Sequence, residues 1–95
     1  MAAYVVANVE VIDSAAYEEY RAKVPGTIAA YGGRYLARSA AAEVLEGDWS
    51  PKRFVILEFP SLAQLKAWYQ SPEYRPLLEI RKRAARTSVI VVEGV

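Results

Sequence analysis

The stretch Arg53-Phe54-Val55-Ile56-Leu57-Glu58-Phe59-Pro60-Ser61-Leu62-Ala63-Gln64-Leu65 places a strand directly before a helix. Residues 53–59 are mostly aromatic and aliphatic, which favours a strand, and Pro60 ends it. Ser61 and Gln64 form a capping box, in which the serine hydroxyl accepts an unpaired amide and the glutamine reaches back to the helix start. Apolar residues then recur at helical spacing from Leu62 to Tyr69.

Similar patterns predict the elements before this stretch. Residues 3–11 are rich in β-branched side chains and predict a strand. Asp13 is suited to cap a following helix, whose apolar stripe recurs every three or four residues until Gly32-Gly33 ends it. Pro25 lacks the N–H for a bond back to Arg21, so we expect a kink or a short break there.

The remaining strands are expected on either side of the second helical region. Residues 34–42 predict a strand that is bulged or weakened at 39–42, continues through 43–46 and then turns. A second helical segment opens at 71–74, and Pro76 either costs it an early hydrogen bond or marks its true first turn. Residues 87–93 predict the last strand.

The order strand, helix, strand, strand, helix, strand leaves few topologies. Right-handed crossovers put the first and third strands in the middle, which gives the strand order 4-1-3-2. We therefore expect an α+β domain with the ferredoxin-like βαββαβ fold, an antiparallel four-stranded sheet and both helices on one face. The 95 residues suit a single domain over 1–95.

The composition excludes several classes of chemistry. The chain has no cysteine and no histidine, which removes disulfides, thiolate nucleophiles and the usual haem and zinc ligands. We expect no metal site and no cofactor. The 12 basic and 11 acidic residues give a net charge of +1, and the third strand lacks the basic-glycine-aromatic run of RNA-recognition domains, so we expect no nucleic acid partner. Without a signal peptide or membrane span, a cytoplasmic protein is expected.

Both faces of the predicted sheet carry apolar side chains. We assign Val5, Ala7 and Val9 of the first strand, with Ile90 and Val92 of the last, to the face that the helices cover. The opposite face then carries a second apolar set: Tyr4, Val6, Phe54, Ile56, Val89 and Val91. Apolar patches of this size usually mark an interface, so we expect a homodimer in which two sheets pack face to face.

Polar residues interrupt that second face. We expect Asn8, Glu10 and Glu58 near one end of the two central strands, within reach of Arg34 and Arg38. The candidate catalytic residues are therefore Asn8, Arg38 and Glu58, with a carboxylate as base and an arginine as anion clamp. The alternative is a network of ion pairs at the rim of the dimer interface, which we favour because such networks are commonly structural.

Aromatic residues indicate a second candidate site. Trp68 and Tyr69 lie beside Tyr74 at helical spacing, and together with Tyr35 they are candidates for lining a pocket that takes a flat ligand. Packing in the core explains the same spacing, and we favour that interpretation. Trp49 lies in the loop before the third strand, where its large side chain needs cover from a partner subunit or a pocket mouth.

Four stretches carry a resemblance to a known family. They are Tyr31–Arg38 (YGGRYLAR), Glu43–Trp49 (EVLEGDW), Leu57–Ser61 (LEFPS) and Ala67–Tyr74 (AWYQSPEY). Together they resemble the domain-of-unknown-function family 1330, within the dimeric α+β barrel group, and the likeness runs over nearly the whole chain. The resemblance implies the fold and the sheet-to-sheet dimer. It implies no reaction, because the family has none assigned.

The wider group suggests which functions to compare. It includes cofactor-independent monooxygenases, muconolactone-isomerase-like enzymes and haem-binding proteins whose histidine ligand this chain lacks. Two functions stay open: a cofactor-independent enzyme of the oxygenase or isomerase type acting on a small organic molecule, or a non-catalytic dimer that binds a small molecule. A third, an association module without a ligand, predicts a filled and dry interior.

Overall fold

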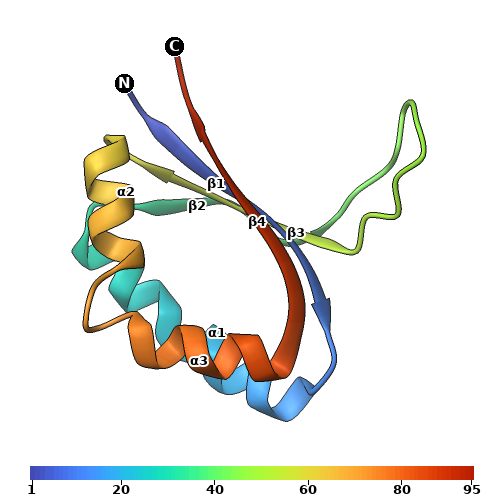
Figure 1. The fold of residues 1–95 in the computed structure, drawn as a ribbon, viewed down its shortest axis with the longest axis horizontal. Coiled ribbons are helices and arrows are strands. Elements are labelled where there is room, and N and C mark those ends of the chain that lie inside the picture. Colours follow the sequence, from blue (N-terminus) through green and yellow to red (C-terminus); the bar gives the residue numbers. More distant parts are fainter.

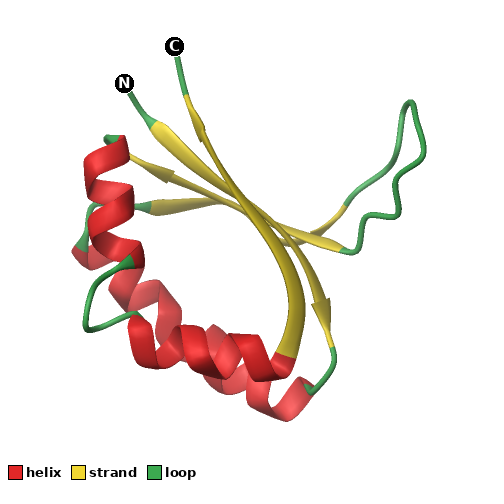
Figure 2. Ribbon diagram, viewed as in Figure 1, coloured by secondary structure: helices red, strands yellow, loops and turns green.

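A computed structural model describes residues 1–95 as a four-stranded antiparallel sheet with helices on one face (Figure 1, Figure 2). The strand order β2-β3-β1-β4 is the predicted order. In chain order the elements are β1 (Ala3–Val11), α1 (Ser14–Ala30), β2 (Arg34–Ala41), β3 (Arg53–Phe59), α2 (Leu62–Tyr69), α3 (Arg75–Ala84) and β4 (Ala85–Glu93). The ferredoxin-like α+β fold is confirmed. No helix has the length and apolar character needed to cross a bilayer.

The capping that the sequence predicts at Asp13 and Ser61 is confirmed. The Asp13 side chain accepts the Ala16 amide at 3.1 Å, and the Ser61 hydroxyl accepts the Gln64 amide at 3.2 Å. The Gln64 side chain reaches back to its helix start, where the Ser61 hydroxyl donates to Gln64 Oε1 at 3.5 Å. Its Nε2 also donates to the Tyr31 carbonyl at 3.2 Å. Because the last carbonyls of a helix lack intrahelical donors, this bond ties α2 to the end of α1.

Helix α1 runs unbroken through Pro25, so the predicted break is wrong. Val24 and Ile28 flank the proline and are only 3% and 2% exposed, so their burial favours helix on both sides. Pro25 cannot donate to the Arg21 carbonyl. That carbonyl accepts a hydrogen bond from Arg38 Nη2 of β2 at 2.7 Å instead. A side chain of the sheet therefore replaces the missing helix bond.

The two faces of β4 are the reverse of the prediction. Val5 lies directly opposite Val91, and residues paired in this way share a face of the sheet. Val89 and Val91 therefore face the helices, while Ile90 and Val92 lie on the face away from the helices, which we call the open face. Both alternating sets of β4 are apolar, so no polar residue marked the register in the sequence.

Strand β2 is irregular and shorter than predicted. Its pairing with β3 shifts register between Tyr35 and Ala37 and again between Ala37 and Ala40. Ser39 has a φ of 55°, which marks the predicted irregularity near 39–42. The strand ends at Ala41, so the predicted continuation through 43–46 is wrong. The loop that follows projects away from the sheet (green in Figure 1).

Gly33 stands where the start of β2 meets the core. A Cβ atom at Gly33 would lie 2.5 Å from Cε1 of Phe59 and 2.9 Å from Cγ2 of Ile28. Both neighbours are buried and have little room to move. Only glycine allows this close approach of the β2 backbone to the core.

We predict that Gly33→Ala lowers the free energy of unfolding by about 2 kcal/mol, because the added methyl group overpacks the core. Gly26→Ala is the matched control, since a Cβ at Gly26 in α1 meets nothing within 4 Å. That control should raise stability by about 0.5–1 kcal/mol through helix propensity. Urea unfolding measures both. Equal stability of the two variants would contradict the packing at Gly33.

Candidate functional site

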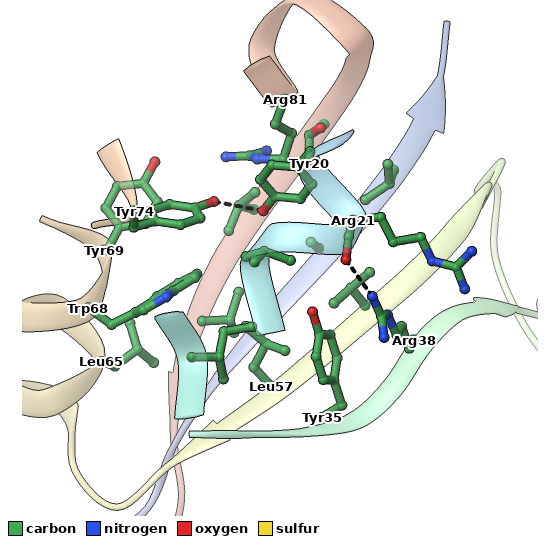
Figure 3. Close-up of a pocket in the computed structure, with 18 of the residues that line it drawn as sticks. Tyr20, Arg21, Tyr35, Arg38, Leu57, Leu65, Trp68, Tyr69, Tyr74 and Arg81 are labelled. Atoms are coloured by element: carbon green, nitrogen blue, oxygen red, sulfur yellow. Dashed lines mark hydrogen bonds between the residues drawn. The ribbon is translucent and has the colours of Figure 1, made fainter. Parts of the chain in front are cut away.

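A cavity of about 410 Å³ lies between the helix-covered face of the sheet and the helices (Figure 3). Strands β1, β3 and β4 supply its apolar floor, and α1, α2 and α3 contribute to its walls. Of the 23 residues that line it, 16 are hydrophobic. Such a volume, with an apolar lining and a few polar groups, is typical of a site for a small organic molecule.

A continuous row of aromatic rings joins the sheet to α1, and its members Trp68, Tyr74 and Tyr20 line the cavity. The ring of Phe59 on β3 lies 5.3 Å from that of Trp68, and Trp68 lies 4.2 Å from Tyr74. Tyr74 is 6.3 Å from Tyr20 on α1. The polar edges of the row are paired, because Trp68 Nε1 donates to Thr27 Oγ1 at 3.0 Å.

Three phenols along the cavity, those of Tyr17, Tyr20 and Tyr35, have a raised pKa and stay protonated at neutral pH. Burial raises the pKa of Tyr20 far above its ordinary value, and the neighbouring Tyr74 adds to the shift. Burial likewise raises the pKa of Tyr17 and Tyr35. The hydroxyls of Tyr20 and Tyr74 are 2.9 Å apart and share one hydrogen bond. That bond uses one of their two hydrogens, so the other is available to a ligand.

The charged groups of the cavity are all cationic. The charged members of its lining are Arg21, Arg38, Lys66 and Arg81. Arg21 contacts Glu18 at 3.7 Å on the exposed outer surface, whereas Arg81 is 8% exposed and forms no ion pair. Three buried side-chain atoms lack a hydrogen-bond partner: Arg21 Nε, Arg81 Nε and Thr87 Oγ1. All three belong to residues that line the cavity.

The three candidate catalytic residues do not meet at one site. Asn8 lies opposite Phe54, near the far end of the antiparallel β1–β3 pair from Glu58, and both are on the open face. Arg38 lines the cavity on the other face. The register shifts in β2 turn the Arg38 side chain toward the helices, where its guanidinium sits 4.8 Å above the Tyr35 ring. Regular alternation, assumed in the prediction, put all three on one face.

Asn8 and Glu58 have structural partners on the open face. The Asn8 side chain accepts the Lys52 amide at 2.9 Å, which fastens the end of the loop before β3. Glu58 accepts from Arg34 Nε at 2.7 Å. This hydrogen bond, together with one from Tyr4, lowers the pKa of Glu58. Glu58 is thus held in an ion pair and Asn8 in a hydrogen bond to the backbone, and the network at the rim of a dimer interface stays a prediction.

The three predicted ligand-binding residues all line the cavity. Trp68 and Tyr69 come from α2 and Tyr35 from β2, and Figure 3 shows them around one space. Trp68 is also a core residue at 2% exposure. Trp68 therefore fits both interpretations of the aromatic spacing, because it packs in the core and also lines the cavity.

The sequence predicts a basic group over residues 81–86 that could bind an anion, with a solvated helix end as the favoured interpretation. It does not single out Tyr20 or Thr87 as site residues. A signal for Arg81 exists, because it continues the apolar stripe of Leu77 and Leu78 along one face of α3. A charged residue on an inward stripe is unusual and marks a buried charge. Thr87 carries no such signal, since threonine is common in strands.

We predict that Arg38→Met lowers the free energy of unfolding by about 1 kcal/mol, because the Arg21 carbonyl loses its donor. In a Pro25→Ala background the backbone amide supplies that donor, so the same substitution should cost about half as much or less. Urea unfolding of the four proteins in this cycle measures the coupling. An equal loss in both backgrounds would show that Arg38 does not replace the missing helix bond.

Solved structures share this fold. A protein of unknown function from Rhodopseudomonas palustris matches with a TM-score of 0.78 and 19% identity, over 99% of this chain and 82% of its own. A dimeric ferredoxin-like protein from Jannaschia sp. CCS1 matches with a TM-score of 0.72 and 17% identity, over 99% and 100%. SnoaB, a cofactor-independent oxygenase from Streptomyces nogalater, matches with a TM-score of 0.64 and 9% identity, over 99% of this chain and 93% of its own. At these identities the likeness shows the fold.

The family is shown by the sequence itself. No curated protein matches the chain. The family model described as a domain of unknown function, DUF1330, matches residues 2–95. This range includes every strand and helix of the structure. The chain therefore belongs to the DUF1330 family.

Proposed function

We propose that this protein binds a small, flat and largely apolar organic molecule in the cavity between its sheet and its helices. The observation that carries the proposal is the cavity of about 410 Å³ beside the ring row of Trp68, Tyr74 and Tyr20. Protein interiors are otherwise close-packed, and an unfilled apolar hollow lowers stability. An aromatic ligand would stack on these rings and occupy the hollow.

A cofactor-independent enzyme of the oxygenase or isomerase type is the second candidate. One observation favours it, because the guanidiniums of Arg38 and Arg81 and the protonated phenol of Tyr20 line the same space. Donors in such an arrangement stabilise an enolate or a phenolate. The lining offers donors and cations but no carboxylate to act as a base. Ligand binding is therefore the function that the geometry supports best.

We further propose that the protein is a homodimer joined through the open face, as a dimeric α+β barrel. The apolar residues of that face are Tyr4, Val6, Phe54, Ile56, Ile90 and Val92. Ile90 is 59% exposed, and Trp49 is 62% exposed although its ring packs on Phe54 at 5.6 Å. A second copy of the sheet would cover these side chains, and the similar Jannaschia protein is dimeric.

We predict that Val89→Phe, which extends a ring into the cavity from β4, abolishes binding of aromatic probes. The probes are 1-naphthamide and 1-naphthoate, and quenching of tryptophan fluorescence measures their binding. Val89→Ile, which changes the volume little, is the matched control and should bind as the wild type does. The proposal fails if the wild type binds neither probe, or if Val89→Phe binds both unchanged.

We predict that Ile90→Asp converts the dimer to a folded monomer. Ile90 is 59% exposed within one chain, so the new charge stays in water in the monomer. It becomes unfavourable only when a second sheet buries it. Val95→Asp, at the fully exposed C-terminus, adds the same charge and should leave the dimer intact. Sedimentation velocity distinguishes the two. A wild type that sediments as a monomer at micromolar concentration would refute the dimer.

A further inference from the structure

We propose that the cavity contains an anion subsite in which Arg81 and Thr87 bind a carboxylate, or a similar planar anionic group, of the ligand. The inference rests on the proposed ligand cavity and adds the charge of the molecule that fills it. The subsite lies where the end of α3 meets the start of β4, and the Arg81 guanidinium lies beside the hydroxyls of Tyr20 and Tyr74 (Figure 3). Its ligand is therefore an aromatic acid.

Arg81 is a buried charge without a counter-charge. Arg81 is only 8% exposed, and its Nε has no hydrogen-bond partner. The ion pairs of the protein involve Arg21, Lys23 and Arg34 and leave Arg81 unpaired. A buried guanidinium in this state is strongly unfavourable unless something else pairs with it. A bound anion supplies that partner.

Thr87 places a second unsatisfied donor in the same region. Its Oγ1 is buried and has no partner, which is rare for a hydroxyl on a β-strand. Arg81 and Thr87 also both line a smaller hollow beside the main cavity, together with Tyr69 and Val89. The two unpartnered groups thus border the same two spaces. A carboxylate has two oxygens, one for the guanidinium and one for the hydroxyl.

The charges around the cavity favour an anion over a neutral ligand. The lining includes four of the 12 basic residues of the chain and none of its 11 acidic residues. Burial acts to lower the pKa of Arg81, but its neighbours Tyr74, which also hydrogen-bonds to it, and Tyr20 raise that pKa on balance. An arginine pKa is already far above 7, so the guanidinium is charged at neutral pH. The spare hydrogen of the Tyr20–Tyr74 pair adds a neutral donor beside the Arg81 guanidinium.

A structural role for Arg81 makes a different prediction. Arg81 lies in the last turn of α3, where a cation interacts favourably with the helix dipole. If this were its purpose, Arg81→Met would destabilise the unliganded protein. The anion subsite predicts the opposite, because methionine fills the same volume without a buried charge, and the melting temperature should rise.

The test compares 1-naphthoate with 1-naphthamide, which share the ring and differ in charge. We expect the wild type to bind the carboxylate about tenfold more tightly, as one charged hydrogen-bonded contact would give. Arg81→Met should lose this preference, with its affinity for the amide unchanged. Arg83→Met removes the same charge from an exposed position on α3 and should keep the preference. Tryptophan quenching at fixed ionic strength measures all affinities.

The outcomes separate the subsite from the ligand cavity itself. If the wild type binds both probes equally, or if Arg81→Met keeps the preference, the anion subsite is refuted while ligand binding stands. If the wild type binds neither probe, the proposed function fails as well. Should Arg81→Met not fold, Thr87→Val provides the test, since it removes one donor with little change in shape. Thr87→Val should lower the affinity for 1-naphthoate several-fold and leave the affinity for 1-naphthamide unchanged.

Discussion

The row of aromatic rings from Phe59 through Trp68 and Tyr74 to Tyr20 is the interaction on which the arrangement of the two layers depends. It links β3, α2, the start of α3 and α1 through successive ring contacts of 4.2 to 6.3 Å. Because the rings are bulky and rigid, the helices pack against one another and against one end of the sheet (Figure 2). The space left over the rest of the sheet becomes the cavity. The core and the lining of the cavity therefore share side chains.

Stability and function oppose one another around this space. A hollow of about 410 Å³ and the unpaired charge of Arg81 each make the unliganded fold less stable than a filled core would be. A small domain has little stability to lose, since it buries a modest share of its surface. Two events would restore it: a ligand that fills the cavity and neutralises Arg81, and a second subunit that covers the open face.

The sequence predicted the fold better than it predicted the site. Apolar periodicity, Asp13 and Ser61 at the helix starts and the handedness of crossovers were enough for the elements and strand order. The faces of β4 were assigned wrongly because Val89 and Ile90 are equally apolar, so alternation held no information. Arg38 was misplaced because bulges in β2 depend on tertiary packing. The unpaired state of Arg81 depends on which residues surround it in space, and no local pattern records that.

The central proposal is that Arg81 binds the anionic group of a ligand inside the cavity. Its most direct test is the ¹H–¹⁵N spectrum of the arginine Nε–H groups while 1-naphthoate is added to the intact protein. We expect the Arg81 Nε–H signal to shift most, because this group donates a hydrogen bond to the carboxylate and has no partner without it. The signal of exposed Arg83 should stay in place. Binding that leaves the Arg81 signal unmoved and shifts only residues of the open face would contradict it.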